Sequence, residues 1–394
     1  MPIRFLTAGE SHGPALVSIL EGIPAGLPLD CSLINADLIR RQQGYGAGPR
    51  MQLEADRAQI LSGVMAGITT GAPLALMVEN SDHARWRGKA IPPYTVPRPG
   101  HADLVGAVKY NFHDLRPALE RASARETAAR VAAGAVCRAL LAQFGIQVEG
   151  YVVSIGPVAA SLETVPLAER ATCARQNEVN CPDPETAAAM LAHIRAAMEN
   201  RDTAGGVIEI LASGLPAGLG SFTQWDRRLD ARLAAAVMSV PAVKGMEIGP
   251  AFENTRLPGT RVHDAIEVNA GSLTRPENRC GGLEGGITNG QPLLLRMAMK
   301  PIPTTLNPQR SVDLASGEPV ATRYERSDFC PVPRAVVVLE AMVALTLADA
   351  LLEKLGGDSL DEIRPRFAAL RQASLADLHM ENLETIFWPL EGEA

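Results

Sequence analysis

Two histidines of this 394-residue chain lie in glycine-containing turns, where a ligand can approach the backbone closely. His12 stands in the segment GESHG (9–13), at the end of the first expected strand. His101 follows a Pro-Gly turn in VPRPGHAD (96–103), with an arginine three residues before it and an aspartate two residues after it. Imidazole exchanges a proton near neutral pH. Because the chain repeats this arrangement, we interpret His12 as a candidate general acid, against the alternative of a solvated loop histidine.

The GESHG segment also fits the G-x-S-x-G pattern of a serine nucleophile, with Ser11 at its centre. That nucleophile needs a helix directly after the serine, whereas Pro14 and the strand-like run ALVSILEG (15–22) follow here. Only eight residues precede the motif, and the late histidines, His263 and His379, lie in no supporting motif. The pattern therefore does not predict a serine hydrolase.

Arginine dominates the basic residues, since only five of the 37 are lysine. The planar guanidinium group suits phosphate and carboxylate, although a GC-rich genome produces the same excess, so only clustered arginines carry information. Such clusters occur in RRQQGYGAGPR (40–50) and in ERASARE (120–126) at a helix start, where backbone N–H groups favour an anion. Each arginine alone is compatible with a solvated surface position. Together they indicate a site for a substrate that bears phosphate and carboxylates.

Apolar periodicity predicts strands over 15–22, 73–79, 148–156, 206–213 and 291–299, and helices over 123–144, 183–200, 227–239 and 334–355. Ser123 followed by Glu126 predicts a capping box, and Gly145 ends that helix. These elements lack the regular spacing of a doubly wound parallel sheet, so we expect a layered α+β fold. No low-complexity linker divides the chain, which favours a single domain over 1–394, with a core over about 3–357 and a helical tail over 358–394.

Composition narrows the class of function. The formal net charge of −7 argues against nucleic-acid binding, which usually needs a basic excess. The most apolar stretch, 335–352, is broken by Glu340 and Asp349, and the N-terminus has no leader pattern, so we expect neither secretion nor a membrane span. The six cysteines are far apart without a C-x-x-C pair, which predicts no metal site and no disulfide framework and suits the cytoplasm.

Seven motifs, in order along the chain, resemble those of chorismate synthase. They are AGESHG, RRQQGYG, RPGHAD, ERASARETAARVAAGAV, GGLEGGITNGQP, MKPIPT and RSDFCPVPRA. The resemblance runs from residue 3 to about residue 357. It implies a sandwich of helices and antiparallel β-sheets. It also implies a lyase of aromatic amino acid biosynthesis, which releases phosphate from 5-enolpyruvylshikimate 3-phosphate by an anti 1,4-elimination to give chorismate. Reduced FMN is needed for this reaction, without net redox change.

The resemblance also implies roles for individual residues. By this analogy, His12 protonates the departing phosphate, His101 protonates the reduced flavin, and Asp328 works with flavin N5 in removing the ring proton. A helix cap before 334 is the structural alternative for Asp328. The residues expected to contact flavin are Arg121, Ala122, Ser123, Pro241, Ala242, Gly285, Lys300, Pro301, Ile302, Pro303, Thr304 and Arg326. The residues expected to bind substrate are Ser11, Arg41, Arg50, Arg98 and Arg125.

Two positions depart from the family pattern. Many members read Gly-Tyr-Gly-Arg-Gly where this chain has Ala47 in place of the arginine, and we expect Arg50 or Arg40 to compensate. Pro241 stands where Gln or Asn is common, which removes one polar contact at the flavin edge. An alternative reading of the chain is therefore a flavin-dependent oxidoreductase that has kept the fold but changed its substrate. A non-catalytic anion-binding protein is the alternative from a different class.

The family is typically a homotetramer, which composition alone does not indicate. The chain has no G-x-G-x-x-G after a strand, so we expect the reduced FMN to come from an external reductant. NADPH then enters only as the indirect electron source, although the sequence leaves weak NADPH binding open.

Overall fold

The structure is a computed structural model that describes residues 2–47, 55–325 and 327–388. The first sheet contains β1 (Arg4–Ala8), β2 (Ala15–Glu21), β6 (Leu74–Glu79) and β3 (Ala58–Ser62), in that order. The second contains β10 (Val243–Ile248), β15 (Leu293–Met299), β9 (Gly206–Ser213), β7 (Gln147–Ile155) and β8 (Val158–Ala159), in that order. Every strand pair described in these two sheets is antiparallel.

The described helices are α1 (Cys31–Gln42), α2 (His83–Trp86), α3 (Asp103–Tyr110), α4 (Arg116–Arg121), α5 (Thr127–Ala142), α6 (Leu167–Ala174), α7 (Pro184–Glu199), α8 (Leu229–Met238), α9 (Ala251–Asn254), α10 (Val332–Leu355) and α11 (Leu360–Ala368). Short hairpins are formed by β4 (Val64–Met65) with β5 (Ile68–Thr69), β11 (Glu267–Asn269) with β12 (Ser272–Thr274), β13 (Leu283–Glu284) with β14 (Ile287–Thr288), and β16 (Arg310–Val312) with β17 (Pro319–Ala321).

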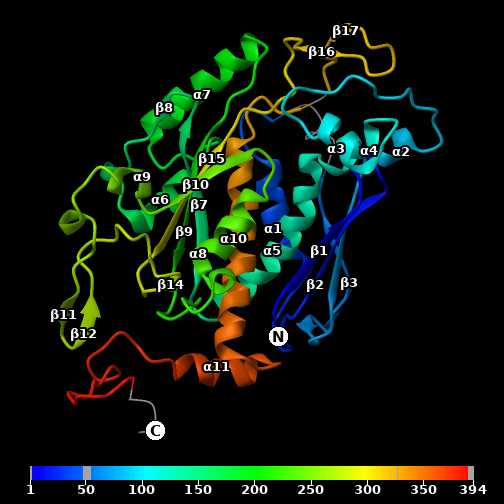
Figure 1. The fold of residues 1–394 in the computed structure, drawn as a ribbon. Helices are drawn as coiled ribbons and strands as arrows, with labels where there is room; N and C mark the ends of the chain where they lie inside the picture. Colours follow the sequence, from blue (N-terminus) through cyan, green and yellow to red (C-terminus); the bar gives the residue numbers. More distant parts are fainter. Residues whose placement is uncertain (1, 48–54, 326, 389–394) are drawn as a thin grey trace.

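Helices α1, α5 and α10 form a layer between the two sheets (Figure 1). Helix α5 packs on β2 and β6 of the first sheet, and α10 packs on β7 and β9 of the second. The layered α+β arrangement expected from the sequence is confirmed. The short helices α2, α3 and α4 lie together at one end of the first sheet, beside the hairpin β16–β17 (Figure 1).

The first sheet buries one apolar face and exposes apolar side chains among polar ones on the other. Leu16 and Leu20 of β2 are buried against the helix layer, as period-two alternation requires. On the opposite face, Ile19 pairs with Leu6 of β1 in the strand register, and both side chains are exposed. An open sheet face that carries such apolar side chains is typical of a surface that is covered by another chain.

Helix α10 fills the centre of the molecule. It is long and apolar enough to cross a membrane, but its most apolar window is 94% buried inside the protein, which identifies a core helix. Glu340, the charge that interrupts the apolar run, is fully buried and accepts hydrogen bonds from Arg40 Nη1 at 2.6 Å and Nη2 at 2.8 Å. It also accepts one from the backbone N–H of Gly150 at 2.8 Å. The charge is therefore matched inside the core.

The expected helix at 123–144 differs at its start. A 3-10 turn over Ala124–Glu126 precedes α5, and Ser123 Oγ accepts from the N–H of Arg125 at 3.3 Å. The capping box is absent because Glu126 instead accepts from Thr7 Oγ1 of β1 at 2.6 Å and from Arg130 Nε at 2.8 Å. The long-range hydrogen bond from Thr7 to Glu126 thus takes the place of the local capping box.

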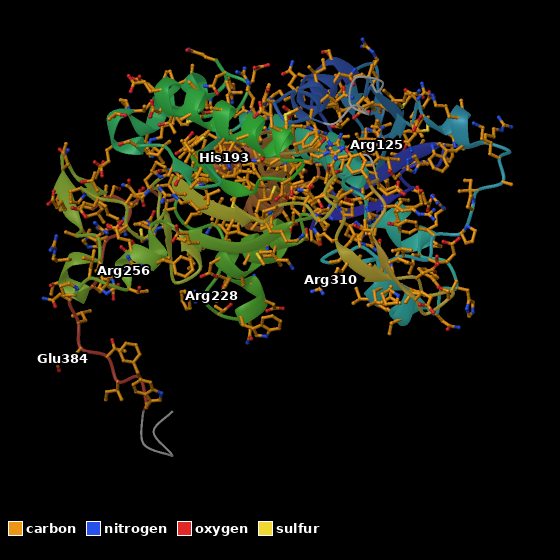
Figure 2. All side chains as sticks on the ribbon, turned by 90° about the horizontal axis from the view of Figure 1, so that it is seen from above. Arg125, His193, Arg228, Arg256, Arg310 and Glu384 are labelled. Atoms are coloured by element: carbon orange, nitrogen blue, oxygen red, sulfur yellow. The ribbon has the colours of Figure 1, made fainter. Side chains whose placement is uncertain are left out.

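The expected helical tail is helix only over Leu360–Ala368 among the described residues. Beyond α11 the chain pairs with the β11–β12 hairpin, where the Leu273 N–H donates to the Ala373 carbonyl at 2.7 Å, and Figure 2 shows Glu384 well separated from the rest of the protein. The predicted strand at 206–213 is observed with the same bounds, because β9 is a continuous buried run between turns.

The contact between α5 and α10 depends on Gly134. A Cβ built there would lie 2.2 Å from the Cβ of Ala341. Helix propensity alone would make Gly134→Ala stabilising by about 1 kcal/mol, but overpacking of a tight core contact costs about 1–3 kcal/mol. We expect Gly134→Ala to lower the free energy of unfolding in urea. Ala188→Gly is the control, because it measures the effect of helix propensity alone on the exposed face of α7. A Gly134→Ala variant that is more stable than wild type would contradict the close contact with Ala341.

Candidate active site

A cavity of about 920 Å³ opens between the α2–α4 region and the ends of β10 and β15. This volume is within the range of about 300–1,000 Å³ that is typical of ligand pockets. Its lining includes many residues singled out by the sequence: Ser11, His12, Arg98, His101, Arg121, Ala122, Ser123, Pro241, Ala242, Lys300, Ile302, Pro303 and Thr304. Segments far apart in the chain thus converge on one cavity.

His12 is held mainly by Glu120, in the last turn of α4. The Glu120 carboxylate lies 2.7 Å from His12 Nδ1 and accepts the backbone N–H of His12 at 2.8 Å. His83 Nδ1 lies 2.9 Å from the His12 carbonyl oxygen, which fixes the same turn from the other side. Burial opposes ionisation of Glu120, but the hydrogen bonds from His12 outweigh it and hold the pKa of that carboxyl below its usual value.

His101 shares a buried carboxylate with Arg98. Asp103 Oδ1 lies 2.6 Å from His101 Nδ1, and Arg98 donates to Asp103 through Nε at 2.8 Å and Nη2 at 2.9 Å. Arg98 Nη1 also donates to Thr304 Oγ1 at 3.2 Å. Asp103 is fully buried. Burial raises its pKa, but the hydrogen bonds from His101 and Arg98 are stronger and hold the pKa of this carboxyl well below its usual range.

A stack of aromatic and cationic groups connects the surroundings of the two histidines. The ring centroids of His12 and Trp86 are 4.3 Å apart. The guanidinium carbon of Arg116 lies 5.6 Å from the Trp86 centroid and 6.0 Å from that of Tyr94. That of Arg98 lies 5.9 Å from the Tyr94 centroid. These separations are those of cation–π contacts, so the stack restricts how the two histidine turns move relative to each other.

Asp328 lies beside the large cavity without lining it. It lines an adjoining cavity of about 90 Å³, together with Arg41 and Arg334. Both cavities are lined by a wall of Ala124, Val240, Pro241, Ala242 and Ile302. Arg334 Nη1 donates to Asp328 Oδ2 at 2.5 Å. The N-cap of α10 is Pro331, without a side-chain hydrogen bond, so Asp328 is not the cap of that helix.

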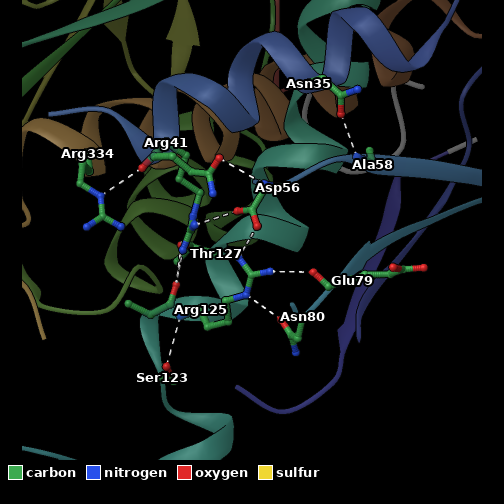
Figure 3. Close-up of polar contacts among 12 residues, drawn as sticks. Asn35, Arg41, Asp56, Ala58, Glu79, Asn80, Ser123, Arg125, Thr127 and Arg334 are labelled. Atoms are coloured by element: carbon green, nitrogen blue, oxygen red, sulfur yellow. Dashed lines mark hydrogen bonds and ion pairs between the residues drawn. The ribbon is translucent and has the colours of Figure 1, made fainter. Parts of the chain in front are cut away.

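Arg41 and Arg125 share Asp56 in a buried network (Figure 3). Arg125 Nη1 donates to Asp56 Oδ1 at 2.6 Å, and Arg41 Nη1 donates to Asp56 Oδ2 at 3.3 Å. Arg125 Nε also donates to Asn80 Oδ1 at 2.7 Å, and Arg334 Nε donates to the Arg41 carbonyl at 3.1 Å. Arg41 reaches the smaller cavity, whereas Arg125 lines neither of the two.

The structure does not place every expected site residue at one of these two cavities. Gly285 is exposed in the turn between β13 and β14 and lines neither cavity. Pro301 is exposed and does not line the cavity that its neighbours line. Arg40 cannot substitute for the arginine missing at Ala47, because its guanidinium group is bound to buried Glu340. Arg50 and Arg326 lie outside the described residues.

The large cavity is basic although the chain is acidic overall. Its described lining contains Arg98, Arg121, Arg130, Lys244 and Lys300, against the carboxylates Glu126 and Glu325. Burial, with a smaller contribution from nearby Lys244, lowers the pKa of Lys300. Concentrated positive charge in a partly enclosed space attracts an anionic ligand.

Sequence reasoning missed four residues of this region: Trp86, Glu120, Lys244 and Arg334. Glu120 and Arg334 belong to motifs that carry the resemblance, but their partners are distant in sequence. Lys244 lies two residues after the expected flavin contacts at 241–242, so its place near that segment was the available signal. Nothing in the sequence around Trp86 indicated a contact with His12.

Three comparisons agree on one family. A family model described as chorismate synthase matches residues 3–352. The chain is 52% identical over 382 residues to a chorismate synthase of Geobacter sulfurreducens, covering 93% of this chain and 97% of the relative. It is 54% identical over 379 residues to a chorismate synthase of Moorella thermoacetica, covering 94% and 98%. A crystal structure of chorismate synthase matches with a TM-score of 0.77 and 45% identity, covering 93% of this chain and 97% of that chain.

The contribution of the buried ion pair between Asp103 and Arg98 to stability can be tested by substituting Asp103. Asp103→Asn leaves Arg98 without its partner, and we expect a loss of about 3–5 kcal/mol in the free energy of unfolding at pH 7. Because the folded state lowers the pKa of Asp103, its contribution is present above the ordinary value of 3.8 and is lost as the pH falls below it. Urea unfolding from pH 7 to pH 3 should show the difference between wild type and variant shrinking only at the acid end.

A matched control is Asp361→Asn, because the Asp361 side chain is 95% exposed and lies 3.6 Å from Arg364. Exposed pairs contribute about 0–1 kcal/mol, so this variant should be nearly as stable as wild type. A difference between wild type and Asp103→Asn that does not depend on pH would contradict the assigned ionisation.

Proposed function

Because the chain belongs to the chorismate synthase family, we propose that it catalyses the anti 1,4-elimination of phosphate from 5-enolpyruvylshikimate 3-phosphate to give chorismate. Members of this family are carbon–oxygen lyases that act on a small molecule. The observation that carries the proposal is the convergence of His12 and His101 on one basic cavity, together with the segments 121–123 and 241–242, Lys300 and the segment 302–304. An acid-assisted departure of phosphate needs both a proton donor and cations of this kind.

We infer that the large cavity holds reduced FMN, since the family generally requires a reduced flavin. Lys244, Lys300 and Arg121 suit a phosphate group. The 300–304 segment suits a planar ring, because its prolines favour extended backbone, and Lys300 N–H donates to the Ala242 carbonyl at 2.9 Å, which ties the two segments together. When bound, the reduced flavin supplies transient electron density that assists C–O cleavage, because the ring proton is only weakly acidic.

We propose the proton-transfer roles that the family resemblance implies, and the pairs described above support them. His12 donates a proton to the departing phosphate oxygen, and Glu120, which lies 2.7 Å from His12 Nδ1, holds the ring in place. His101 would supply a proton to the reduced cofactor from the large cavity, which it lines. Asp328 would accept the ring proton beside the flavin, and Arg334, which donates to Asp328 Oδ2, would hold that carboxylate in place.

The substrate's phosphate and carboxylates require cations. Arg98 and Ser11 line the large cavity, and Arg41 lines the smaller one, which supports their assignment to substrate binding. Arg125 and Arg41 already bind Asp56, so a substrate anion that uses them must compete with that carboxylate. Arg50 remains part of the proposal, and Ala47 removes one cation that many relatives have.

We further propose a cytoplasmic homotetramer, as is typical of the family, with no nucleic-acid or membrane partner. The open face of the first sheet, with Leu6 and Ile19 exposed, supports association between copies. An external reductase supplies reduced FMN, with NADPH only as its electron source. The second candidate function is a flavin-dependent oxidoreductase with altered substrate, which the loss of an arginine at Ala47 favours.

An anaerobic assay separates the two functions. Purified protein, reduced FMN and 5-enolpyruvylshikimate 3-phosphate should release one phosphate for each chorismate formed, while the flavin absorbance returns to that of the reduced form. Lyase chemistry consumes no reducing equivalents, so turnover should exceed the amount of flavin. Stoichiometric flavin oxidation would instead support the oxidoreductase.

Removal of either cavity histidine should reduce turnover strongly. General acid catalysis contributes about 10²–10⁴-fold, so we expect kcat of His12→Ala and of His101→Ala to fall by a factor in that range in the same assay. His193→Ala is the control, since His193 lies on α7 and does not line the cavity (Figure 2). Unchanged kcat in both variants would contradict the assigned acid roles, whereas a non-catalytic anion-binding protein would release no phosphate as wild type or as either variant.

A further inference from the structure

Glu120 makes three contacts with the turn that carries His12. Its carboxylate Oε1 lies 2.7 Å from His12 Nδ1, and Oε2 accepts the backbone N–H of His12 at 2.8 Å. Its own carbonyl oxygen accepts the backbone N–H of Ser11 at 3.2 Å. The side chains of His12 and Glu120 are only 16% and 12% exposed, so water competes little for these contacts.

These contacts determine which nitrogen of His12 takes part in chemistry. An ionised carboxylate can only accept hydrogen bonds, so the Nδ1 that faces Glu120 must carry the hydrogen. The lowered pKa of Glu120 is consistent with its ionised form. Nε2 is then the ring nitrogen that must exchange a proton with a ligand in the cavity that His12 lines.

The surroundings of the ring restrict its remaining freedom. The Trp86 ring lies against that of His12, with 4.3 Å between the centroids and 38° between the planes, and the guanidinium carbon of Arg116 lies 5.6 Å from the Trp86 centroid. Trp86 fixes the plane of the ring but has no acceptor that could select a tautomer. The contact of the Glu120 carboxylate with Nδ1 is what selects between the two nitrogens.

We propose that Glu120 is a positioning residue that fixes the tautomer and orientation of His12, so that Nε2 faces the cavity. The inference rests on the proposed function and names a residue on which proton donation to the departing phosphate depends. Glu120 itself lies behind the histidine and is not part of the cavity lining.

Glu120→Gln tests the proposal because an amide has one acceptor oxygen and one donor nitrogen. It cannot accept from both Nδ1 and the backbone N–H of His12. We expect kcat for phosphate release to fall about 100-fold, as for a general acid that is no longer correctly held, while KM changes less than about twofold. Glu120→Asp keeps both acceptor oxygens and should retain more activity than Glu120→Gln.

The decisive measurement is a double-mutant cycle with His12→Ala. If Glu120 acts through His12, Glu120→Gln should cause almost no further loss of kcat in the His12→Ala background. An equal fold-loss in both backgrounds would overturn the proposal, and so would a raised KM with unchanged kcat. Thermal unfolding and reduced-FMN binding of each variant identify any loss that comes from misfolding, and Glu120→Asp then supplies the test.

Glu149→Gln is the matched control, because Glu149 on β7 is also partly buried and paired with an arginine, Arg175, at 2.5 Å. Glu149 contacts no histidine of the cavity, so the kcat of the Glu149→Gln variant should equal that of wild type. Failure of the proposed function is distinguishable from failure of this inference. The first appears as wild-type protein that releases no phosphate, and the second as additive losses in a protein that does.

Discussion

Each of the three groups assigned to proton transfer is hydrogen-bonded to an ionisable partner, and the geometry of the site depends on this pairing. Glu120 holds His12, Asp103 is fully buried beside His101, and Arg334 contacts Asp328. Separating a buried charge from its partner costs several kcal/mol. Conformations that displace the loops carrying these groups are therefore disfavoured. These contacts fix the position of the short turns that carry His12 and His101. The glycine- and proline-rich backbone of the turns would not fix it alone.

The two cavities separate His12 from Asp328, the residues proposed as acid and base. His12 lines the larger cavity and Asp328 the smaller, with the segment 240–242 as part of their common wall. An imidazolium and a carboxylate in direct contact would satisfy each other instead of a substrate. In an anti elimination the proton and the leaving group depart on opposite faces, so separated positions suit the two tasks. Positive charge is concentrated in the larger cavity, although the chain as a whole carries a formal charge of −7.

Local signals in the sequence were sufficient for the turns and the buried strands. His12, His101 and Arg98 were found because glycine, proline and charge occur together within a few residues. Pairings across the fold could not be found in this way, since Glu120 lies 108 residues from His12 and Asp56 lies 69 residues from Arg125. Through these pairings Glu120 gains a role that the sequence did not predict. Arg125, which was expected to bind substrate, instead binds Asp56 inside the protein. The capping box at Ser123 failed for the same reason, because Thr7 and Arg130 bind Glu126 instead.

The central position of α10 has a consequence for biosynthesis. This helix begins at Val332 and packs against α1, α5 and α8 as well as β7 and β9. A ribosome delivers these partners first, so their inner apolar surfaces wait for α10 until synthesis is nearly complete. The nascent chain must therefore stay soluble while its future core is exposed. The stretch that resembles a membrane span is thus the last large piece of the interior to be added, and folding of the enzyme is completed only after its arrival.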